Sequence, residues 1–262
     1  MAERAVSEVL SFVLIFSLVV TAVGIVYASG LAGLESARSA EQVDNAARAF
    51  DVLADNMADI HRSRAPGRKT EIKLSDASLA YSGTATEIDV TVEGVVSDGN
   101  RTHFDAESTP IVYGTDGEAR LVYEGGAVVR RDGDYVRMLR EPPFLFRDDR
   151  VVLAYVETVA PARSVSGSET VLVRGERTRS ALLVTDEAGD PTLNGDANAV
   201  TVNLTVTAAD GRVEAWRDYL VGQPGVTCGS PSVVDEDRRT VACRFETEEL
   251  AVSVTSIELG LN

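Results

Sequence analysis

The sequence is short of the residues on which most enzyme and metal-site chemistry depends. It contains two histidines and two cysteines among 262 residues, too few ligands for a Cys/His zinc site and too few bases for most histidine-driven catalysis. It also lacks a phosphate-binding glycine loop, a Gly-x-Ser-x-Gly elbow and a His-Glu-x-x-His motif. We therefore expect no enzyme activity, no cofactor and no metal. Paired acids such as Asp148 and Asp149 arise by chance in so acidic a chain, so a membrane-tethered hydrolase is the least favoured alternative.

Lysine is almost absent, because Lys69 and Lys73 are the only two and the other 23 basic residues are arginines. Acidic residues number 41, which gives a formal net charge of -16. A chain so acidic is unsuited to neutralising phosphates, so we expect no nucleic-acid partner. At molar salt the Debye length falls to about 3 Å and screens repulsion between carboxylates. The composition thus predicts a halophilic protein, whereas a GC-rich genome would explain the arginines but not the excess of acid.

One long stretch near the N-terminus lacks charge altogether. Residues 9–34 are 26 consecutive uncharged positions and include the run Val-Leu-Ser-Phe-Val-Leu-Ile-Phe-Ser-Leu-Val-Val. A helix rising about 1.5 Å per residue needs roughly 20 apolar residues to cross the hydrocarbon core. An ordinary signal peptide has a shorter apolar region followed by a cleavage site and a structural break. We therefore predict a membrane span over residues 9–34.

The helical pattern continues beyond this span. Apolar residues from Val43 to Ile60 recur at steps of three and four, with charged residues on the opposite face. No proline occurs before Pro66, so we expect one helix over residues 6–64, loosened at Gly24, Gly30 and Gly33. We expect the last turns of the stripe to pack on the chain's own C-terminal domain. The three glycines are the predicted helix-to-helix contacts, because small residues let backbones approach closely.

The residues in front of the apolar run resemble the processing site of archaeal type IV pilins and archaellin-like proteins. Arg4 and Ala5 precede Val6, Ser7 and Glu8, and the apolar helix follows at once. The resemblance implies that a prepilin-type peptidase removes residues 1–5 on the cytoplasmic side and leaves the helix on a mature chain beginning at Val6. Bacterial pilins place a glutamate at the fifth mature position, whereas the helix-start acid here, Glu8, is at the third. The alternative is a plain signal-anchor helix preceded by a coincidental Arg-Ala pair.

The cysteines indicate on which side of the membrane the rest of the chain lies. Cys228 and Cys243 flank a short segment, and a disulfide between them implies an oxidising compartment outside the membrane. The charges around the helix scarcely favour either orientation. Asn100 and Asn203 begin Asn-x-Thr sequences and are candidate glycosylation sites.

The remainder of the chain has strand-like alternation, as in Glu-Ile-Asp-Val-Thr-Val at residues 87–92. Turn sequences such as Thr115-Asp116-Gly117 separate the candidate strands, which favours antiparallel hairpins, and no alternating helices suggest a parallel sheet. The further candidate strands are residues 72–74, 111–113, 120–123, 127–131, 135–138, 151–159, 170–174, 181–185, 200–207, 240–245 and 250–259. A short helix over residues 213–220 would pack Trp216 against the sheet, and a core role for Trp216 is favoured over a pocket role. The predicted fold class is α+β: a long N-terminal transmembrane and amphipathic helix followed by a mainly antiparallel β-rich head over residues 70–262.

Few other residues suggest a ligand. His61 and His103 have no nucleophile nearby in sequence and are predicted to be surface histidines. Residues 186–198 are rich in the oxygen ligands that calcium prefers but lack the EF-hand order, so a solvated loop is favoured over a calcium site.

These observations predict a structural protein of the cell surface. The helix would be held in the membrane or in a filament core, with the head outside the cell, as a major or minor subunit of a type IV pilus-like filament. Its partners would be membrane lipid, the prepilin-type peptidase and other pilin-like subunits or copies of itself. The alternative is a membrane-anchored extracellular binding module that never polymerises.

Overall fold

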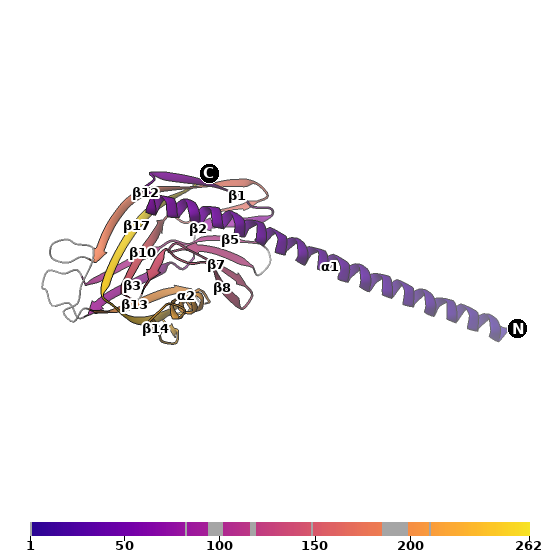
Figure 1. Cartoon of the computed structure of the whole chain (residues 1–262). Helices are drawn as coiled ribbons and strands as arrows, with labels where there is room; N and C mark the ends of the chain where they lie inside the picture. The colour runs from indigo at the N-terminus through magenta and orange to yellow at the C-terminus, as the bar shows by residue number, and fades with distance from the viewer. Residues whose placement is uncertain are drawn as a thin grey trace. The chain divides into compact units, whose positions relative to one another are not determined.

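The computed structural model describes residues 2–81, 83–93, 102–115, 119–147, 149–184, 199–209 and 211–262. The chain divides into two compact units, Met1–Asp44 and Asn45–Asn262, and we call the second unit the head. Helix α1 (Ala2–Arg62) supplies the first unit and continues into the second, where strands and a short helix, α2 (Arg212–Val221), follow (Figure 1). The fold class is α+β with mostly antiparallel sheets, as predicted.

Helix α1 is continuous through Gly24, Gly30 and Gly33, so the expected loosening at these positions does not interrupt it. It begins before the predicted start and ends two residues before the predicted end. Arg64 has a φ of 54°, and Ala65 precedes a proline, which disfavours helical backbone. The chain therefore leaves the helix at Arg62 and enters the first strand at Gly67.

The head contains three sheets among its described residues. Sheet A has the order β1 (Gly67–Lys73), β12 (Thr170–Val184), β17 (Glu249–Leu261), β10 (Arg150–Val159) and β9 (Phe144–Phe146). Sheet B has the order β11 (Arg163–Gly167), β2 (Ala77–Tyr81), β5 (Ile111–Gly114), β6 (Arg120–Glu124), β7 (Ala127–Asp132) and β8 (Tyr135–Arg140). Sheet C has the order β14 (Thr227–Cys228), β16 (Arg238–Thr247), β13 (Val200–Ala209), β3 (Thr86–Glu93) and β4 (His103–Ser108), and β15 (Ser232–Val233) also pairs with β16.

Each predicted strand overlaps a strand of the structure, but the candidates at residues 170–174 and 181–185 are parts of one strand, β12. The prediction missed the strands β2, β4, β9, β11, β14 and β15. One pairing is parallel: β10 runs alongside β17 with Arg150 opposite Glu249. The other pairings described are antiparallel, which fits the predicted hairpins.

The last turns of α1 belong to the head and bury their apolar stripe in it. Phe50, Leu53, Met57 and Ile60 have no exposed surface, and burying each such side chain contributes about 1.5–3 kcal/mol. The Phe50 ring meets the ring of Tyr113 on β5 edge-on, with centroids 6.3 Å apart. The stripe therefore packs on the chain's own head over these turns, as predicted.

A glycine on β12 permits the closest approach of α1 to sheet A. A Cβ atom at Gly175 would lie 2.9 Å from Met57 Cε and 3.0 Å from Ile257 Cγ2, closer than packed carbon atoms lie. Beside this contact, Asn56 Nδ2 donates to Thr70 Oγ1 at 2.8 Å. Glycine thus lets the methionine side chain lie directly against the strand.

Helix α2 packs the only tryptophan into the core of the head, as predicted. Trp216 has no exposed surface and lies in a cluster with the inward residues of β3, β13 and β16, including Val90, Leu204 and Val241. Along β13 buried and half-buried positions alternate over the whole strand, which is the pattern of a strand with one face on a core.

A carboxylate lies inside this core, which sequence reasoning did not anticipate. Glu124, at the end of β6, has no exposed surface and accepts hydrogen bonds from Arg212, Thr86 and the Trp216 indole, the last at 3.0 Å. Gly125 and Gly126 follow it with φ of 57° and 90°, and such positive values form the tight turn to β7. A buried charge is stable only when it is paired and hydrogen-bonded. The Glu124–Arg212 ion pair meets this need and links α2 to sheet B.

The outer face of sheet C holds carboxylates directly opposite one another. Glu87 on β3 faces Glu107 on β4, and Asp89 faces Asp105. Arg238 donates to Glu87 Oε1 at 2.7 Å, and His103 Nε2 lies 2.7 Å from Asp89 Oδ2. Like charges opposite each other destabilise a strand pair. We therefore expect added salt to stabilise the β3–β4 pairing by screening this repulsion.

We expect loss of the buried ion pair to destabilise the head. Arg212→Leu leaves the Glu124 carboxylate buried without its cation, which should lower the free energy of unfolding by about 3–5 kcal/mol. Arg150→Leu is the matched control, because the Arg150–Glu249 pair is exposed and should contribute less than about 1 kcal/mol. Urea titration of the full chain in detergent, followed by circular dichroism, measures both. Equal losses for the two variants would contradict this role for the pair.

We expect Glu107→Gln to raise the melting temperature in 0.1 M sodium chloride by about 1–3 °C, because it removes a carboxylate facing Glu87. In 2 M sodium chloride the difference should vanish, because the repulsion is already screened. Glu71→Gln is the control, since the exposed Glu71 faces Leu172 rather than an acid. The prediction is wrong if both variants shift the melting temperature alike at low salt.

Candidate membrane anchor and head surfaces

Helix α1 contains a segment that is long and apolar enough to cross a membrane, Ser11–Gly30, with 20 residues and a mean hydropathy of 2.4. None of it is buried inside the structure. Leu14, Ile15 and Tyr27, which point in different directions around the helix, are 63%, 62% and 69% exposed. Thr21 Oγ1 donates to the Ser17 carbonyl at 2.8 Å, so this hydroxyl is satisfied within the helix, as an apolar environment requires. The segment lies inside the predicted span of residues 9–34.

The three candidate packing glycines are open on the helix surface. A Cβ atom placed at Gly24, Gly30 or Gly33 would meet nothing within 4 Å. They are therefore free to contact lipid or another helix, and no contact within the described residues requires glycine there.

The predicted processing residues Arg4, Ala5 and Val6, together with Glu8, fall within α1. Their side chains lie outside the described part of the structure. Cleavage after Ala5 and any role of Glu8 remain predictions.

The two histidines differ in their surroundings. His61 was predicted to be a surface residue, which is wrong: it is half-buried, and its Nδ1 lies 2.8 Å from Thr255 Oγ1 on β17. Burial lowers the pKa of His61, and the neighbouring Arg62 lowers it further. His61 follows directly after the buried stripe of α1, so its ring packs against the head. The sequence around the histidine alone does not predict this contact. His103 is exposed, as predicted.

The other candidate ligand sites are largely beyond the described residues. The possible calcium loop, 186–198, and the glycosylation candidate Asn100 lie outside them. Asn203 is half-buried on β13, where its Nδ2 donates to Glu93 Oε1 at 2.9 Å. Within the described ranges no group of three His, Cys, Asp or Glu side chains is placed to hold a metal ion.

The predicted disulfide joins Cys228 to Cys243, with a sequence separation of 15. The two residues are directly opposite each other on β14 and β16. Cys243 is 2% exposed and belongs to the core cluster of sheet C. The bond therefore fastens the edge strand β14 and the end of α2 to the sheet.

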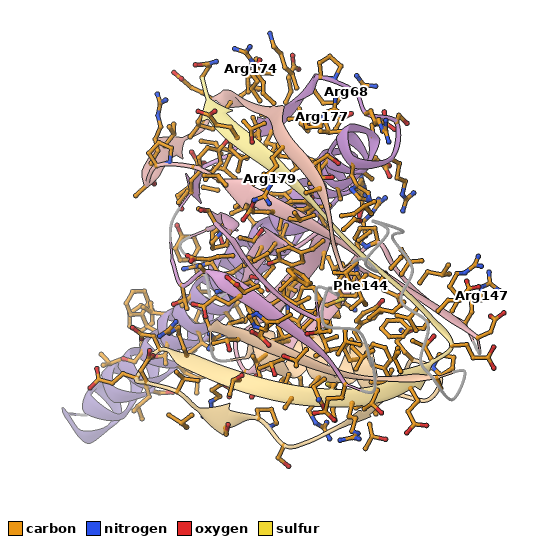
Figure 2. The ribbon with its side chains drawn as sticks, turned by 90° about the vertical axis from the view of Figure 1, so that its left-hand side faces the viewer. Arg68, Phe144, Arg147, Arg174, Arg177 and Arg179 are labelled. Atoms are coloured by element: carbon orange, nitrogen blue, oxygen red, sulfur yellow. A yellow bond between two sulfur atoms is a disulfide. The ribbon has the colours of Figure 1, made fainter. Side chains whose placement is uncertain are left out.

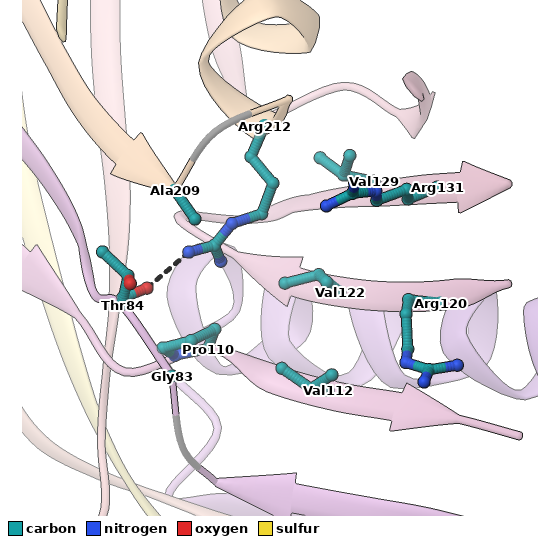
Figure 3. A pocket seen from close by; sticks show the side chains of 10 residues that line it. All are labelled: Gly83, Thr84, Pro110, Val112, Arg120, Val122, Val129, Arg131, Ala209 and Arg212. Carbon is teal, nitrogen blue, oxygen red and sulfur yellow. Dashed lines mark hydrogen bonds between the residues drawn. The ribbon is translucent and has the colours of Figure 1, made fainter. Parts of the chain in front are cut away.

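A pocket of about 300 Å³ opens on the outer face of sheet B (Figure 3). Its floor is a row of valines across three paired strands, with Val112 opposite Val122 and Val122 opposite Val129. The next row holds Arg120 opposite Arg131. The pocket is completed by Gly83, Thr84, Pro110, Ala209 and Arg212. We call this site the arginine-rimmed pocket.

The three arginines of the pocket have different hydrogen-bond partners. Arg212 is bound to Glu124 and to the Thr84 carbonyl, so its charge is already matched. Arg120 donates to the Thr115 carbonyl at 2.8 Å, and Arg131 donates to the Gly133 carbonyl at 2.8 Å. Sequence reasoning missed this pocket, although the alternation of β6 and β7 puts Arg120 and Val122, and Val129 and Arg131, on one face. The pairing register that makes them neighbours is not visible in the sequence.

A second basic region lies on sheet A. Figure 2 shows Arg68, Arg174 and Arg177 gathered at one end of the head, with Arg179 nearer its middle. Arg68 pairs with Asp59 at 3.1 Å, and Arg174 pairs with Glu176. Three of these arginines are on β12, so cations are concentrated on one strand of an otherwise acidic chain.

Comparison with known families matches residues 4–260 to a family of unknown function, DUF7289. The chain belongs to the DUF7289 family. No curated protein and no solved structure matches it.

The match is informative about architecture. It begins ahead of the apolar segment of α1 and extends into β17, the last strand described. The apolar helix, the three sheets and the disulfide thus fall together within the sequence that defines DUF7289. We conclude that helix and head belong to one family architecture.

We expect the disulfide of this DUF7289 chain to stabilise the head by about 3 kcal/mol, since it closes a loop of 15 residues. Cys228→Ser with Cys243→Ser should lower the urea midpoint of the full chain in detergent, and reductant should lower the wild-type midpoint to the same value. Alkylation of intact cells without reductant should leave both wild-type cysteines unmodified. Labelling of both would show that the bond does not form in the cell.

Proposed function

We propose that this DUF7289 protein is a pilin-like structural subunit of the cell surface. Its apolar helix would be held in the membrane or in a filament core, and its disulfide-bonded head would face the outside. The observation that carries the proposal is the helix: Ser11–Gly30 is apolar and exposed, while the same helix ends buried among the sheets of the head. Among the described residues this apolar part has no partner within the chain, and lipid or helices of other chains would supply one.

Two further features support this proposal. Arg4 and Ala5 precede Val6, Ser7 and Glu8, directly ahead of the apolar run, and the pilin resemblance puts the cut of a prepilin-type peptidase after Ala5. The buried stripe of Phe50, Leu53, Met57 and Ile60 is already occupied by the head. Assembly through the helix would therefore use its apolar part, where Gly24, Gly30 and Gly33 are open.

The acidity of the chain suits a halophilic setting within the same proposal. The net charge of -16 and the facing carboxylates of β3 and β4 both favour high salt. Asn203 and Asn100 would be glycosylation sites of an outward head. The proposal gives the head no catalytic role.

A specific observation favours a second function, that of an anchored extracellular binding module that does not polymerise. The arginine-rimmed pocket has the volume and the mixture of apolar and charged lining that small-ligand sites show. In that case the helix would serve only as an anchor, and the three glycines would have no partner.

The proposed function predicts a mature chain that begins at Val6. Intact-mass analysis of the membrane fraction should show loss of residues 1–5, and part of the protein should appear in filaments sheared from the cell surface. A chain that keeps residues 1–5, or one that starts after Gly30, would remove the pilin-like assignment.

Glycine variants in the same experiment separate the two functions. Gly30→Leu with Gly33→Leu adds bulk where helices would meet, so the protein should stay processed in the membrane but leave the sheared fraction. Gly30→Ala with Gly33→Ala is the matched control, since it keeps the surface small and should remain in filaments. Wild-type protein that is monomeric in mild detergent and absent from sheared material would favour the anchored module.

A further inference from the structure

Strand β1 forms an open edge of sheet A. Within the described residues it pairs with β12 and with no other strand. Leu172 of β12 lies directly opposite Glu71, but its N–H and C=O groups are both bonded to Asn262. Because bonded and non-bonded pairs alternate along an antiparallel ladder, Glu71 and Lys73 turn their backbone groups away from β12. No hydrogen bond within the described residues uses these groups, so they can bond another strand.

The charges on this edge alternate in sign. Lys69, Glu71 and Lys73 are exposed on one face of β1, and these are the only two lysines of the chain. Neither Glu71 nor Lys73 forms an ion pair within the part of the chain that the structure describes. Lysines on an edge strand by themselves discourage pairing with another chain. An acid between two lysines favours pairing in one register, because it can be placed opposite a lysine of a second copy.

We propose that β1 pairs with β1 of a second copy, antiparallel and across a two-fold axis at Ile72. In this register Glu71 faces the second copy's Lys73, and Lys73 faces the second copy's Glu71. Each facing pair also exchanges two backbone hydrogen bonds, since these are the residues whose N–H and C=O groups point outwards. Both copies use the same patch, as a two-fold contact requires. Two sheets of five strands thereby join into one of ten.

The other two-fold registers are disfavoured by charge or by an existing contact. An axis at Glu71 puts the two Glu71 side chains together and Lys69 opposite Lys73, and an axis at Lys73 puts the two Lys73 side chains together. Like charges opposite each other destabilise a strand pair. In a register that places Glu71 opposite Lys69, the Lys69 carbonyl is already used, because it accepts a hydrogen bond from Asn56 Nδ2 at 3.3 Å. The axis at Ile72 brings together opposite charges and unused backbone groups.

Helix α1 leaves this half of β1 open. The polar contacts described between α1 and β1 are at the other end of the strand, where Asn56 binds Lys69 and Thr70. Asp59 of α1 pairs with Arg68 at 3.1 Å in the same region. A second β1 centred on residue 72 therefore does not displace a described polar contact of the helix.

This contact goes beyond the proposed function, because it needs neither processing nor a filament and does not use the glycines of α1. It is also compatible with molar salt. Salt screens exposed ion pairs, whereas the backbone hydrogen bonds join neutral groups. The charges then select the register, and the backbone supplies the lasting part of the contact.

Cysteine cross-linking between two tagged full-length copies tests the register. One copy carries Glu71→Cys and the other carries Lys73→Cys, and membranes are oxidised with copper phenanthroline. Facing residues of a hydrogen-bonded pair have Cα atoms about 5.5 Å apart, a distance that a disulfide spans. We expect a dimer bearing both tags, since one Glu71–Lys73 pair remains in this combination. Peptide mapping checks that the new bond joins positions 71 and 73 and that the native Cys228–Cys243 bond is intact.

Lys69→Cys in place of Lys73→Cys is the matched control. Lys69 is also an exposed lysine on the same face of β1. In the proposed register it lies four residues further along the second copy's strand, about 14 Å from the partner of Glu71. Equal or higher yield with Lys69→Cys, or no dimer in either combination, overturns the proposal.

Charge reversal tests whether the two ion pairs stabilise the contact. Lys73→Glu brings like charges together at both facing pairs and should weaken dimerisation in 0.1 M sodium chloride by about tenfold or more. Glu71→Lys with Lys73→Glu exchanges the charges and should restore it. Lys69→Glu is the control, because position 69 then faces the uncharged Ser75. Sedimentation of the full chain in detergent measures dimerisation, and circular dichroism confirms that the variants are folded. Failure of the exchanged variant to recover contradicts the pairing.

A helix-mediated dimer is separated from this one by a change in α1. The cysteine pair is also placed on chains carrying Gly30→Leu and Gly33→Leu, in which the β1 cross-link should keep its yield. Loss of the cross-link there, or cross-linking of Glu71→Cys to a different protein and not to the second copy, overturns the proposal. Absence of the cross-link in processed, filament-forming protein refutes the β1 contact and leaves the proposed function standing.

Discussion

The burial of the last turns of α1 is the interaction on which the organisation of the head depends. Phe50, Leu53, Met57 and Ile60 fill space between strands of sheets A and B that would otherwise expose apolar faces. The helix is also tied by polar contacts, from Asn56 to β1 and from Arg140 on β8 to Asp55. The last turns of α1 therefore behave as part of the head. A force applied to these turns is transmitted directly to sheets A and B. The anchoring role proposed above needs this coupling.

Much of this architecture could be predicted because it rests on local patterns. The uncharged run before Glu35 and the stripe ending at Ile60 specify one long helix through composition and period alone. The alternation of β3 and β13 is clear because each strand has one face on the core and one in water. The cysteine pair was predicted by elimination, since the chain has only two. In each case the signal lies within a few residues of sequence.

The features that were missed depend on partners far apart in the chain. Glu124 is buried because Arg212, 88 residues away, neutralises it, and sequence position alone suggests a surface acid. Strand β4 was overlooked because its inward residues include the small Ala106 and Ser108 rather than a run of large apolar side chains. The parallel pairing of β10 with β17 and the valine and arginine rows of sheet B arise from strand register. Register is a property of pairs of strands, and a single strand does not encode it.

The position of β17 has a consequence for how the protein is made. This strand lies between β12 and β10 in the middle of sheet A, and it comes after every other strand described. During synthesis sheet A therefore stays divided until residues 249–261 have left the ribosome, by which time the apolar helix has long been exposed. Until β17 is present, no strand joins β10 to β12. Strands β1 and β12 can then pair only with each other, and an isolated two-stranded pair is marginally stable in water. Sheets B and C do not contain β17, so sheet A is the part of the head whose closure waits for the end of the described chain.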